Sequence, residues 1–364
     1  MQWIRPDIDI NFVGMRYKAF LVSGALILLS LAAMVWRGGL NLGVDFAGGT
    51  QVQIQFQRPT NPDEIRNALA DLGFSQSAIQ QVGAASDHEY LIRTDVTTSD
   101  LSDISRKVEE SLCKAYGEGQ ATVRRVEMVG PKVGHDLRQK ALFAIYYALL
   151  FIAIYVSGRF ELKWGTSGIM VGVLIVGVYL LEAMGVPVGY LIVGALLVTM
   201  GFCWFLKLPY ALAAVLALVH DVVVTVGAFA VTNKEFTLEV LAALLTIAGY
   251  SLNDTIVVFD RVRENIRKVR KEEFKKLIND SINQTLSRTL LTGGTTLLAL
   301  VFLFLFGGTV IHDFAFAMII GIVTGTYSSV FVACPLLITY QDWAAGGASQ
   351  PKKKPSRPEV PRIK

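Results

Sequence analysis

Charged residues are scarce in this sequence, and the motifs of familiar enzymes are missing from it. Of its 364 residues, 18% are charged and 52% are hydrophobic, a balance that is unusual for a soluble globular chain. The sequence contains no HExxH zinc motif, no GxSxG nucleophile motif and no GxxxxGK[ST] phosphate-binding loop. We therefore expect a membrane protein that is not an enzyme and that holds no cofactor and no metal ion.

Cysteine is equally rare, with three residues that stand far apart at Cys113, Cys203 and Cys334. They form no CxxC pair and no spacing typical of a metal site or of a disulfide framework. Two of them lie inside apolar runs, so we interpret the cysteines as packing residues.

Long apolar runs are what the sequence has in abundance. Because a helix needs about 20 apolar residues to cross a bilayer, we predict eight transmembrane helices. They lie near residues 19–36, 137–157, 166–186, 188–206, 208–230, 238–259, 286–306 and 314–340. The first run follows a short basic segment, as a signal peptide does, but its length favours an uncleaved span.

Cations gather before the first span, directly after residue 260 and in the last part of the chain. The middle group consists of Arg261, Arg263, Arg267, Lys268, Arg270, Lys271, Lys275 and Lys276. The positive-inside rule places both termini and the 260–287 loop in the cytoplasm, which agrees with an even number of spans. Residues 341–364 are rich in lysine and proline, and we predict a disordered basic tail there.

The long polar segment 37–134 separates the first two spans and predicts a periplasmic domain. Residues 50–56 alternate between apolar and glutamine side chains, as a half-buried strand does. Further elements are predicted as helices at 61–72 and 98–116 and as strands at 79–82, 90–93 and 122–129. The order β-α-β-β-α-β is typical of a ferredoxin-like α+β domain. His88 stands alone in this segment, so no catalytic group is predicted there.

A glycine-rich segment, residues 43–50 (GVDFAGGT), joins the first span to this domain. Gly43, Gly48 and Gly49 permit turns or a close approach of backbones. From composition alone, a linker is the simplest interpretation. Residues 129–134 mark the return to the membrane in the same way.

The 261–288 segment carries apolar residues at helical spacing. They are Phe274, Leu277, Ile278, Ile282 and Leu286. This pattern predicts an amphipathic helix that lies on the cytoplasmic membrane surface.

Several polar groups interrupt the apolar runs. His220 and Asp221 lie near the middle of the fifth run, Asp254 lies close to the inner end of the sixth, and Arg288 begins the seventh. A carboxylate at membrane depth is unfavourable by a few kcal/mol on insertion scales, so it is a functional-site hypothesis by default.

Arg288 shares one helical face with three threonines of the same run, Thr292, Thr295 and Thr296. We expect this polar stripe to point into the bundle. Two antiparallel helices joined through the 260–287 loop could bring Asp254 and Arg288 to similar depth. Such a pair is less unfavourable than either charge alone, and it could switch when a proton binds or leaves.

Structural interpretations of the same residues stay open. Asp254 and Arg288 could form a purely structural pair, Arg288 could reach the membrane surface with its long side chain, and His220 and Asp221 could make a helix–helix hydrogen bond. The presence of two intramembrane acids and an arginine favours function. Without a nucleotide-binding loop, the energy source would be an ion gradient.

Several segments, taken in order, resemble SecF, the smaller half of the SecD–SecF protein-export factor and a relative of the proton-driven RND transporters. These segments are residues 43–50, 129–134, 159–161 (RFE), 220–221 (HD), 249–255 (GYSLNDT), 258–265 (VFDRVREN), 283–289 (NQTLSRT) and 295–300. The resemblance extends from about residue 10 to residue 340. It implies an RND-like helix bundle with a ferredoxin-like periplasmic domain in the bacterial inner membrane.

The resemblance also implies what the site residues do. Asp254 and Arg288 match the residues that the family uses for proton passage, with Asn253, Thr292 and, more weakly, His220 and Asp221 beside them. The residues expected to serve as structural motifs are Gly43, Asp45, Gly48, Gly49, Gly249, Asp260 and Arg261. The implied partners are SecD, the SecYEG channel, YajC, a translocating preprotein and membrane lipid, without nucleic acid.

One feature departs from the family, whose members usually have six spans. Here an inserted hairpin at about 164–206 separates the RFE segment from the helix that carries His220 and Asp221. Two other functions stay open as alternatives. An RND-type exporter of lipid or small molecules would usually need two membrane halves, and a membrane hydrolase that used His220 and Asp221 would lack a nucleophile and metal ligands.

Overall fold

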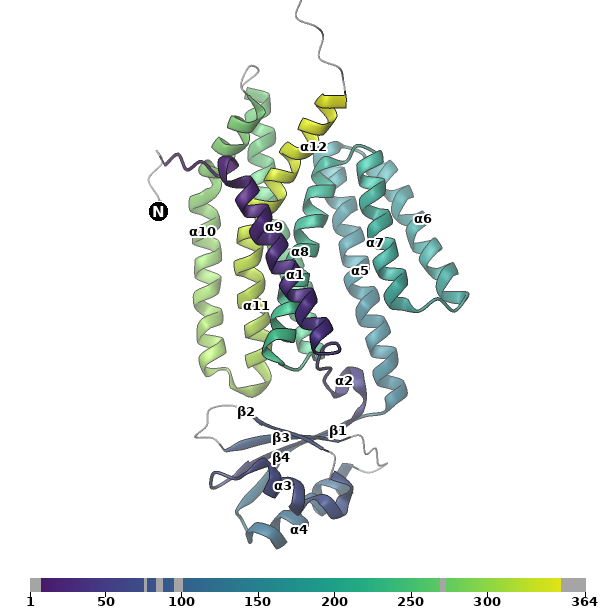
Figure 1. The fold of residues 1–364 in the computed structure, drawn as a ribbon, viewed down its shortest axis with the longest axis vertical. Helices are drawn as coiled ribbons and strands as arrows, with labels where there is room; N and C mark the ends of the chain where they lie inside the picture. The colour runs from purple at the N-terminus through teal and green to yellow at the C-terminus, as the bar shows by residue number, and fades with distance from the viewer. Residues whose placement is uncertain (1–7, 75–76, 83–87, 95–100, 269–272, 348–364) are drawn as a thin grey trace, which may run out of the picture.

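The structure is a computed structural model that describes residues 8–74, 77–82, 88–94, 101–268 and 273–347. A long bundle of helices stands over a small sheet domain, and the described chain begins and ends at the bundle end away from the sheet (Figure 1). Eight segments of the described chain are long and apolar enough to cross a membrane, which confirms the predicted number.

The helices of the bundle follow one another along the chain with short connections. A short 3₁₀ turn, η1 (Val13–Met15), precedes the first of them. They are α1 (Arg16–Trp36), α5 (Pro131–Glu161), α6 (Trp164–Ala183), α7 (Val188–Phe205), α8 (Pro209–Thr232), α9 (Leu238–Lys268), α10 (Phe274–Phe306) and α11 (Gly308–Ser328). The last span continues from α11 through a π-helical turn, η5 (Ser329–Ala333), into α12 (Cys334–Gly347).

The sheet domain contains four antiparallel strands in the order β2-β3-β1-β4. The strands are β1 (Gly49–Phe56), β2 (Ala78–Val82), β3 (Glu89–Thr94) and β4 (Ala121–Val129). The helices are α3 (Pro62–Ala68), the 3₁₀ turn η2 (Ala70–Leu72) and α4 (Leu101–Tyr116). The order of elements predicted from the sequence is therefore confirmed.

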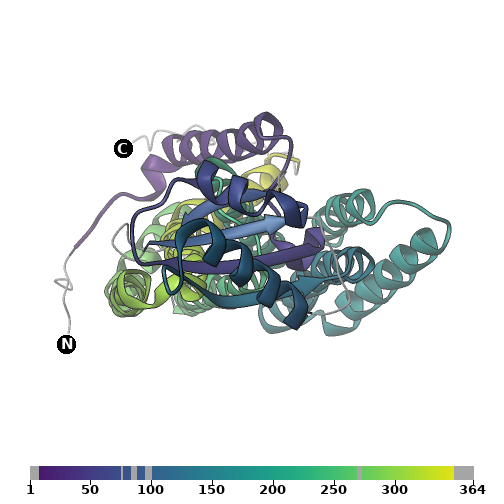
Figure 2. The same cartoon turned by 90° about the horizontal axis from the view of Figure 1, so that it is seen from below.

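Alternation along β1 gives the sheet two different faces. Val52, Ile54 and Phe56 are buried against apolar residues of α3 and α4, which cross the same face of the sheet (Figure 2). Gln51 and Gln53 point the other way and line a cleft between the sheet and the end of the helix bundle. One face thus forms a core, and the polar face lies toward the membrane-spanning part.

The glycine-rich segment is a packed junction, and its interpretation as a simple linker is wrong. Residues Val44–Ala47 form a short helix, α2, at the start of the sheet domain. Gly48 follows with φ +78, and a Cβ atom there would lie 2.8 Å from Pro131 at the start of α5. A side chain is excluded by both the left-handed backbone and the neighbouring chain. The segment therefore fastens the sheet domain to α5.

Small residues let the central helices approach one another. Gly321 and Gly325 of α11 face α9, where added Cβ atoms would lie 2.3 Å from Ile247 and 2.9 Å from Ser251. Gly227 of α8 meets Ser30 of α1 in the same way. Such contacts bring backbones close together in membrane bundles, and here they bring α9 and α11 together at the level of the polar residues.

At the bundle end away from the sheet domain, the structure differs from two predictions. Residues 274–286 are the first turns of the single continuous helix α10, and Leu277, Ile278 and Ile282 are buried in the core of the bundle. Their apolar stripe packs against other helices of the bundle, so residues 274–286 are not a separate helix on the membrane surface. Residues 341–347 continue α12 as helix, while the tail from 348 onward lies outside the described residues.

The inserted hairpin, α6 and α7, forms one flank of the bundle (Figures 1 and 2). The ring of Trp164 lies directly on Gly158 of α5, where a Cβ would come within 2.1 Å of the ring. The hydroxyl of Ser167 donates a hydrogen bond of 2.6 Å to that of Ser157. The hairpin is thus packed closely on α5.

Candidate functional site

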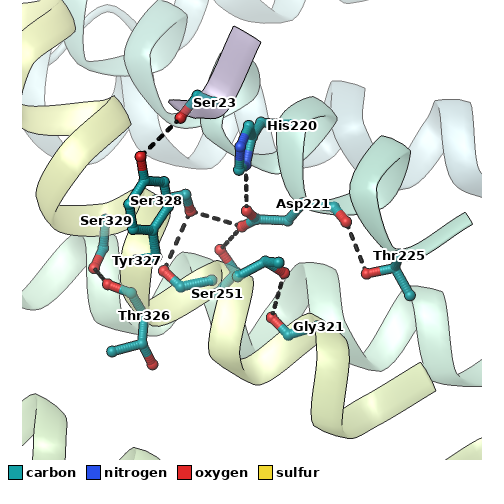
Figure 3. A network of polar contacts seen from close by, with 12 residues as sticks. Ser23, His220, Asp221, Thr225, Ser251, Gly321, Thr326, Tyr327, Ser328 and Ser329 are labelled. Atoms are coloured by element: carbon teal, nitrogen blue, oxygen red, sulfur yellow. Dashed lines mark hydrogen bonds and ion pairs between the residues drawn. The ribbon is translucent and has the colours of Figure 1, made fainter. Parts of the chain in front are cut away.

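Asp221 lies at the centre of a buried polar network in the middle of the bundle (Figure 3). Its side chain is fully buried. Oδ1 lies 2.9 Å from Nδ1 of His220, and Oδ2 accepts hydrogen bonds from the hydroxyls of Ser251 (2.6 Å) and Ser328 (2.8 Å). A buried carboxylate requires such donors, and here they come from three helices, α8, α9 and α11.

The network continues from His220 toward α1. The imidazole is almost fully buried and stacks on Tyr327, with ring centroids 6.1 Å apart. The Tyr327 hydroxyl donates to the carbonyl of Ala19 (2.9 Å) and accepts from the hydroxyl of Ser23 (3.2 Å). Nε2 of His220 is buried and has no hydrogen-bond partner. His220 and Asp221 therefore do make helix–helix contacts, as one of the open interpretations expects.

Asp254 is a second buried carboxyl, one helical turn beyond Ser251 on α9, and its surroundings are poorer in donors. Its side chain is 2% exposed, and its Oδ2 atom is buried without a hydrogen-bond partner. The Thr326 hydroxyl is the hydrogen-bonding neighbour of this carboxyl group. A carboxylate left without a counterion at such a site is unfavourable by several kcal/mol. The geometry therefore favours a protonated Asp254.

The expected ion pair between Asp254 and Arg288 is not formed in this structure. Arg288 is exposed and lines a cleft of about 530 Å³ between α9 and α10, together with Asn253 and Asp260. Asp254 turns to the other side of α9, toward α11. The depth of the two residues is similar enough for an electrostatic interaction, but the rotation of α9 about its axis separates them.

The threonine stripe on α10 does not point uniformly into the bundle, which corrects a further prediction. Thr292 is half-buried, and its hydroxyl donates to the carbonyl of Arg288 one turn earlier (3.0 Å). Thr295 is exposed. Thr296 accepts a hydrogen bond of 3.2 Å from the hydroxyl of Tyr250 on α9. Only part of the stripe contacts the neighbouring helix.

The RFE segment, residues 159–161 at the end of α5, ties three helices together. Arg159 forms an ion pair of 2.5 Å with Asp260 of α9, and its carbonyl accepts from Arg263 (2.8 Å). The Glu161 carboxylate accepts from the backbone N–H of Tyr210 (2.9 Å) and so caps the first turn of α8. These contacts fix the bundle end that carries the cations.

Arg261 and Gly249, two other residues expected to be structural, have fewer contacts. Arg261 pairs with Glu264 one turn later on the same helix (2.9 Å). Gly249 is exposed, and a Cβ atom there would meet nothing within 4 Å. Packing within this chain therefore does not explain the glycine at position 249.

At the opposite bundle end, the glycine-rich segment contacts the start of α9. The carboxylate of Asp45 accepts from the N–H of Leu238 (3.0 Å), the first residue of that helix. Gly43 donates from its backbone to the carbonyl of Phe236 (3.0 Å), and a Cβ at Gly43 would lie 2.9 Å from Thr237. The helix that carries Asp254 thus begins at a direct contact with the sheet domain.

Glu235 lies at the same junction, outside the spans. Its carboxylate is 3.8 Å from Arg93 of β3, which also donates to the carbonyl of Leu42 (2.5 Å). Burial raises the pKa of Glu235, Arg93 opposes this rise, and Asp313 and Asp45 add to it. The junction therefore contains one titratable contact between the sheet domain and the bundle.

The sequence analysis missed the hydroxyl donors of the buried network. Ser328 and Tyr327 had no assigned role, and Ser251 appeared only as a letter of the 249–255 segment. The available signal was the spacing of Ser251 and Asp254, which places both on one face of α9. Among the described residues, no group of three or more His, Cys, Asp or Glu side chains could hold a metal ion.

Fold and site together define a multi-pass helical membrane protein that buries two carboxyl groups between its spans. Residues 108–204 and 203–343 match the family model for the protein export membrane protein SecD/SecF C-terminal region, and residues 38–60 match the SecD/SecF GG motif. The chain therefore belongs to the SecF family of protein translocase subunits.

Individual relatives agree with this assignment. The chain is 41% identical over 338 residues to the protein translocase subunit SecF of Desulfurispirillum indicum, which covers 91% of this chain and 92% of the relative. It is 37% identical to SecF of Vibrio alginolyticus, over 93% of this chain and 91% of the relative. Among solved structures, SecDF from Thermus thermophilus superposes with a TM-score of 0.73 and 31% identity. That match covers 93% of this chain and 40% of the SecDF chain.

Proposed function

We propose that this subunit couples proton flow across the membrane to late-stage translocation of preproteins, with Asp254 as the proton-binding group. The observation that carries this proposal is the burial of Asp254 without a cationic partner. A carboxyl group in that position is favourable when protonated and unfavourable when charged. Loss of its proton would therefore have to be accompanied by a rearrangement that brings water or a cation to it.

Arg288 is the cation that such a rearrangement would bring to Asp254. It lines the cleft that α9 and α10 form with the end of α5, together with Asn253. A rotation of α9 about its axis would turn Asp254 toward this cleft and allow the proton to leave on that side. Thr292 lies one turn deeper on α10, beside the same path. Asp221 holds α8 to α11 through Ser328, and these two helices serve as the fixed part. The rotation of α9 would break the hydrogen bond from Ser251 to Asp221.

The start of α9 contacts the glycine-rich segment, and this contact would transmit a movement of α9 to the sheet domain. Asp45 caps the first turn of α9, and Gly48 is wedged against the start of α5. A movement of α9 would therefore pull on the segment from which β1 begins. We propose that residues 37–134 are a periplasmic domain of the ferredoxin-like type and that this domain handles the emerging preprotein.

The partners and the location follow from the family. Because the chain corresponds to 40% of the SecDF chain, we propose that SecD supplies the remainder of the complex. SecYEG would provide the channel, with YajC as a further subunit. We place the protein in the bacterial inner membrane with both termini in the cytoplasm, where the cations after Asp260 and in the tail favour retention.

The direct test is to follow release of a secreted preprotein after depletion of this protein from its host, with and without a proton gradient. Wild-type protein should restore release only when the gradient is present. Asp254→Asn should assemble normally but should not restore release. The matched control is Glu239→Gln, which changes an exposed carboxylate in the first turn of the same helix, away from the cleft that contains Arg288, and should retain most activity. Unimpaired release after depletion, or full rescue by Asp254→Asn, would contradict the proposal.

A further inference from the structure

The inserted hairpin creates an apolar groove that the rest of the bundle could not form alone. The groove has a volume of about 350 Å³ and lies between α7, α8 and α12. It is lined by Gly201 and Trp204 of α7, Leu216 of α8, and Leu336 and Tyr340 of α12. These helices belong to segments that are long and apolar enough to cross a membrane, so the apolar lining of the groove suits the hydrocarbon of the bilayer.

Two lysines belong to the chain segments at one end of the groove. The turn between α7 and α8 carries Lys207, which is exposed and lies between the groove-lining residues Trp204 and Pro209 in sequence. The ammonium group of Lys163 reaches the same turn and donates to the carbonyls of Leu206 (2.8 Å) and Lys207 (3.1 Å). The ammonium group of Lys163 therefore lies beside the turn at which the groove ends. This turn joins α7 to α8 at the bundle end away from the sheet domain (Figure 1).

Aromatic side chains cluster at the same end. Trp204 contacts Tyr340 with ring centroids 5.2 Å apart, and it contacts Trp343 with centroids 4.5 Å apart. Tryptophan and tyrosine are typical of the level at which lipid headgroups lie. Apolar lining, interfacial aromatic residues and cations thus follow one another along a single path, in the order of the parts of a phospholipid.

We propose that this groove binds one acyl chain of an anionic phospholipid, with its phosphate near Lys207 and Lys163. Basic sites between spans on the cytoplasmic side are suited to such headgroups. The chemistry of the path favours a lipid over a partner helix, because an apolar lining leads to aromatic rings and then to the ammonium group of Lys163.

The first test fills the groove. Gly201→Leu would place an apolar side chain in the groove, and a Cβ there meets nothing within 4 Å, so the fold should tolerate it. Gly194→Leu is the matched control, because it lies on the same helix, is equally open and does not line the groove. Native mass spectrometry of the full-length, delipidated protein during titration with palmitoyl-oleoyl-phosphatidylglycerol measures the tightest binding event.

We expect Gly201→Leu to weaken that binding about tenfold or more, because a buried chain loses most of its apolar contact, while Gly194→Leu leaves it unchanged. Lys207→Gln should reduce the preference for phosphatidylglycerol over phosphatidylethanolamine by about fivefold. Equal binding by wild type and Gly201→Leu would overturn the site. Equal preference for the two lipids in wild type would overturn the assignment of an anionic headgroup.

A second test does not depend on blocking the groove. A photo-crosslinking phenylalanine analogue at position 204, activated in native membranes, should gain the mass of a phospholipid. A crosslink to another polypeptide in place of lipid would overturn the proposal and would identify the groove as a protein interface. Neither outcome bears on Asp254, so the proposed translocation function is tested separately.

Discussion

The bundle buries two aspartates about one helical turn apart in depth, and they are held in different ways. Asp221 meets His220, Ser251 and Ser328, which together satisfy both of its oxygens. Asp254 has Thr326 beside it, an oxygen without a partner, and no ion pair with Arg288. Two carboxyl groups that are equally buried thus differ in the number of hydrogen-bond donors that face them.

This difference has a physical consequence. Hydrogen bonds to a buried carboxylate stabilise its charged form and the helices that supply the donors. A carboxyl group without donors contributes little to the packing of the bundle, and it changes in free energy most strongly when it gains or loses a proton. The two residues should therefore respond in opposite ways to the same substitution.

The largest expected effect is on translocation by Asp254→Asn. The amide is close in shape to the protonated acid but cannot release a proton, so gradient-driven release of preprotein should fall at least about tenfold, the fall expected when a required proton-transfer group is removed. The melting temperature of the purified variant should stay near that of wild type. Preprotein release in membrane vesicles and thermal unfolding in detergent measure the two quantities. A clearly lower melting temperature of Asp254→Asn would show that Asp254 has a structural role, as Asp221 does.

Asp221→Asn should lower the stability of the protein more than Asp254→Asn does. Two serine hydroxyls and an imidazole would face an amide that can accept fewer hydrogen bonds, so the free energy of unfolding should fall by about 1–3 kcal/mol. Thermal unfolding in detergent, with Asp254→Asn measured alongside, checks this. An unchanged stability would show that the network around Asp221 does not hold the helices together.

A smaller effect is expected when one donor is removed from the network. Ser328→Ala takes away one of the hydrogen bonds to Oδ2 of Asp221 and should lower the free energy of unfolding by about 1 kcal/mol. Ser329→Ala is the control, since that neighbouring hydroxyl bonds only to the carbonyl of Thr326 one turn earlier. Equal losses in the two variants would remove the special role of the Asp221 network.

Glu235 adds a buried carboxyl outside the spans, with Arg93 as its cation. Burial raises its pKa above the ordinary 4.5. Its contribution to stability is therefore fully present below pH 4.5 and declines as the pH rises through the raised pKa. Glu235→Gln should remove that decline and change stability by less than about 1 kcal/mol. Melting temperatures of the full-length protein across this pH range, with exposed Glu239→Gln as control, measure the effect.

Sequence periodicity was sufficient for the spans and for the strands. A run of apolar residues sets the length of a transmembrane helix, and the alternation along 50–56 sets one face of β1, whatever the partners are. The stripe that includes Leu277 and Ile282 was different, because the same spacing suits a membrane surface and a protein core. Only tertiary packing distinguishes a surface helix from a core helix with this spacing, and here the residues belong to one long helix, α10.

The site was predicted only in part, because the sequence indicates the depth of a residue in the bundle but not the direction in which its side chain points. Depth along a helix follows from residue number, so Asp254 and Arg288 were placed at similar levels. The rotation of α9 about its axis depends on all the helices that pack against it, including the close contacts of Gly321 and Gly325. This rotation cannot be predicted from the sequence pattern of α9 alone. The hydrogen bond from Ser328 to Asp221 was not predicted, because a serine in a membrane helix usually donates to a backbone carbonyl of its own helix.

The central claim is that Asp254 carries a proton in this structure while Asp221 is held by donors. Infrared difference spectroscopy of the full-length protein in lipid, at neutral pH, tests it most directly through the C=O stretch of a protonated carboxyl group. We expect such a band in wild type and in Glu239→Gln, and its loss in Asp254→Asn. A wild-type spectrum without the band, or a band unchanged by Asp254→Asn, would contradict the account.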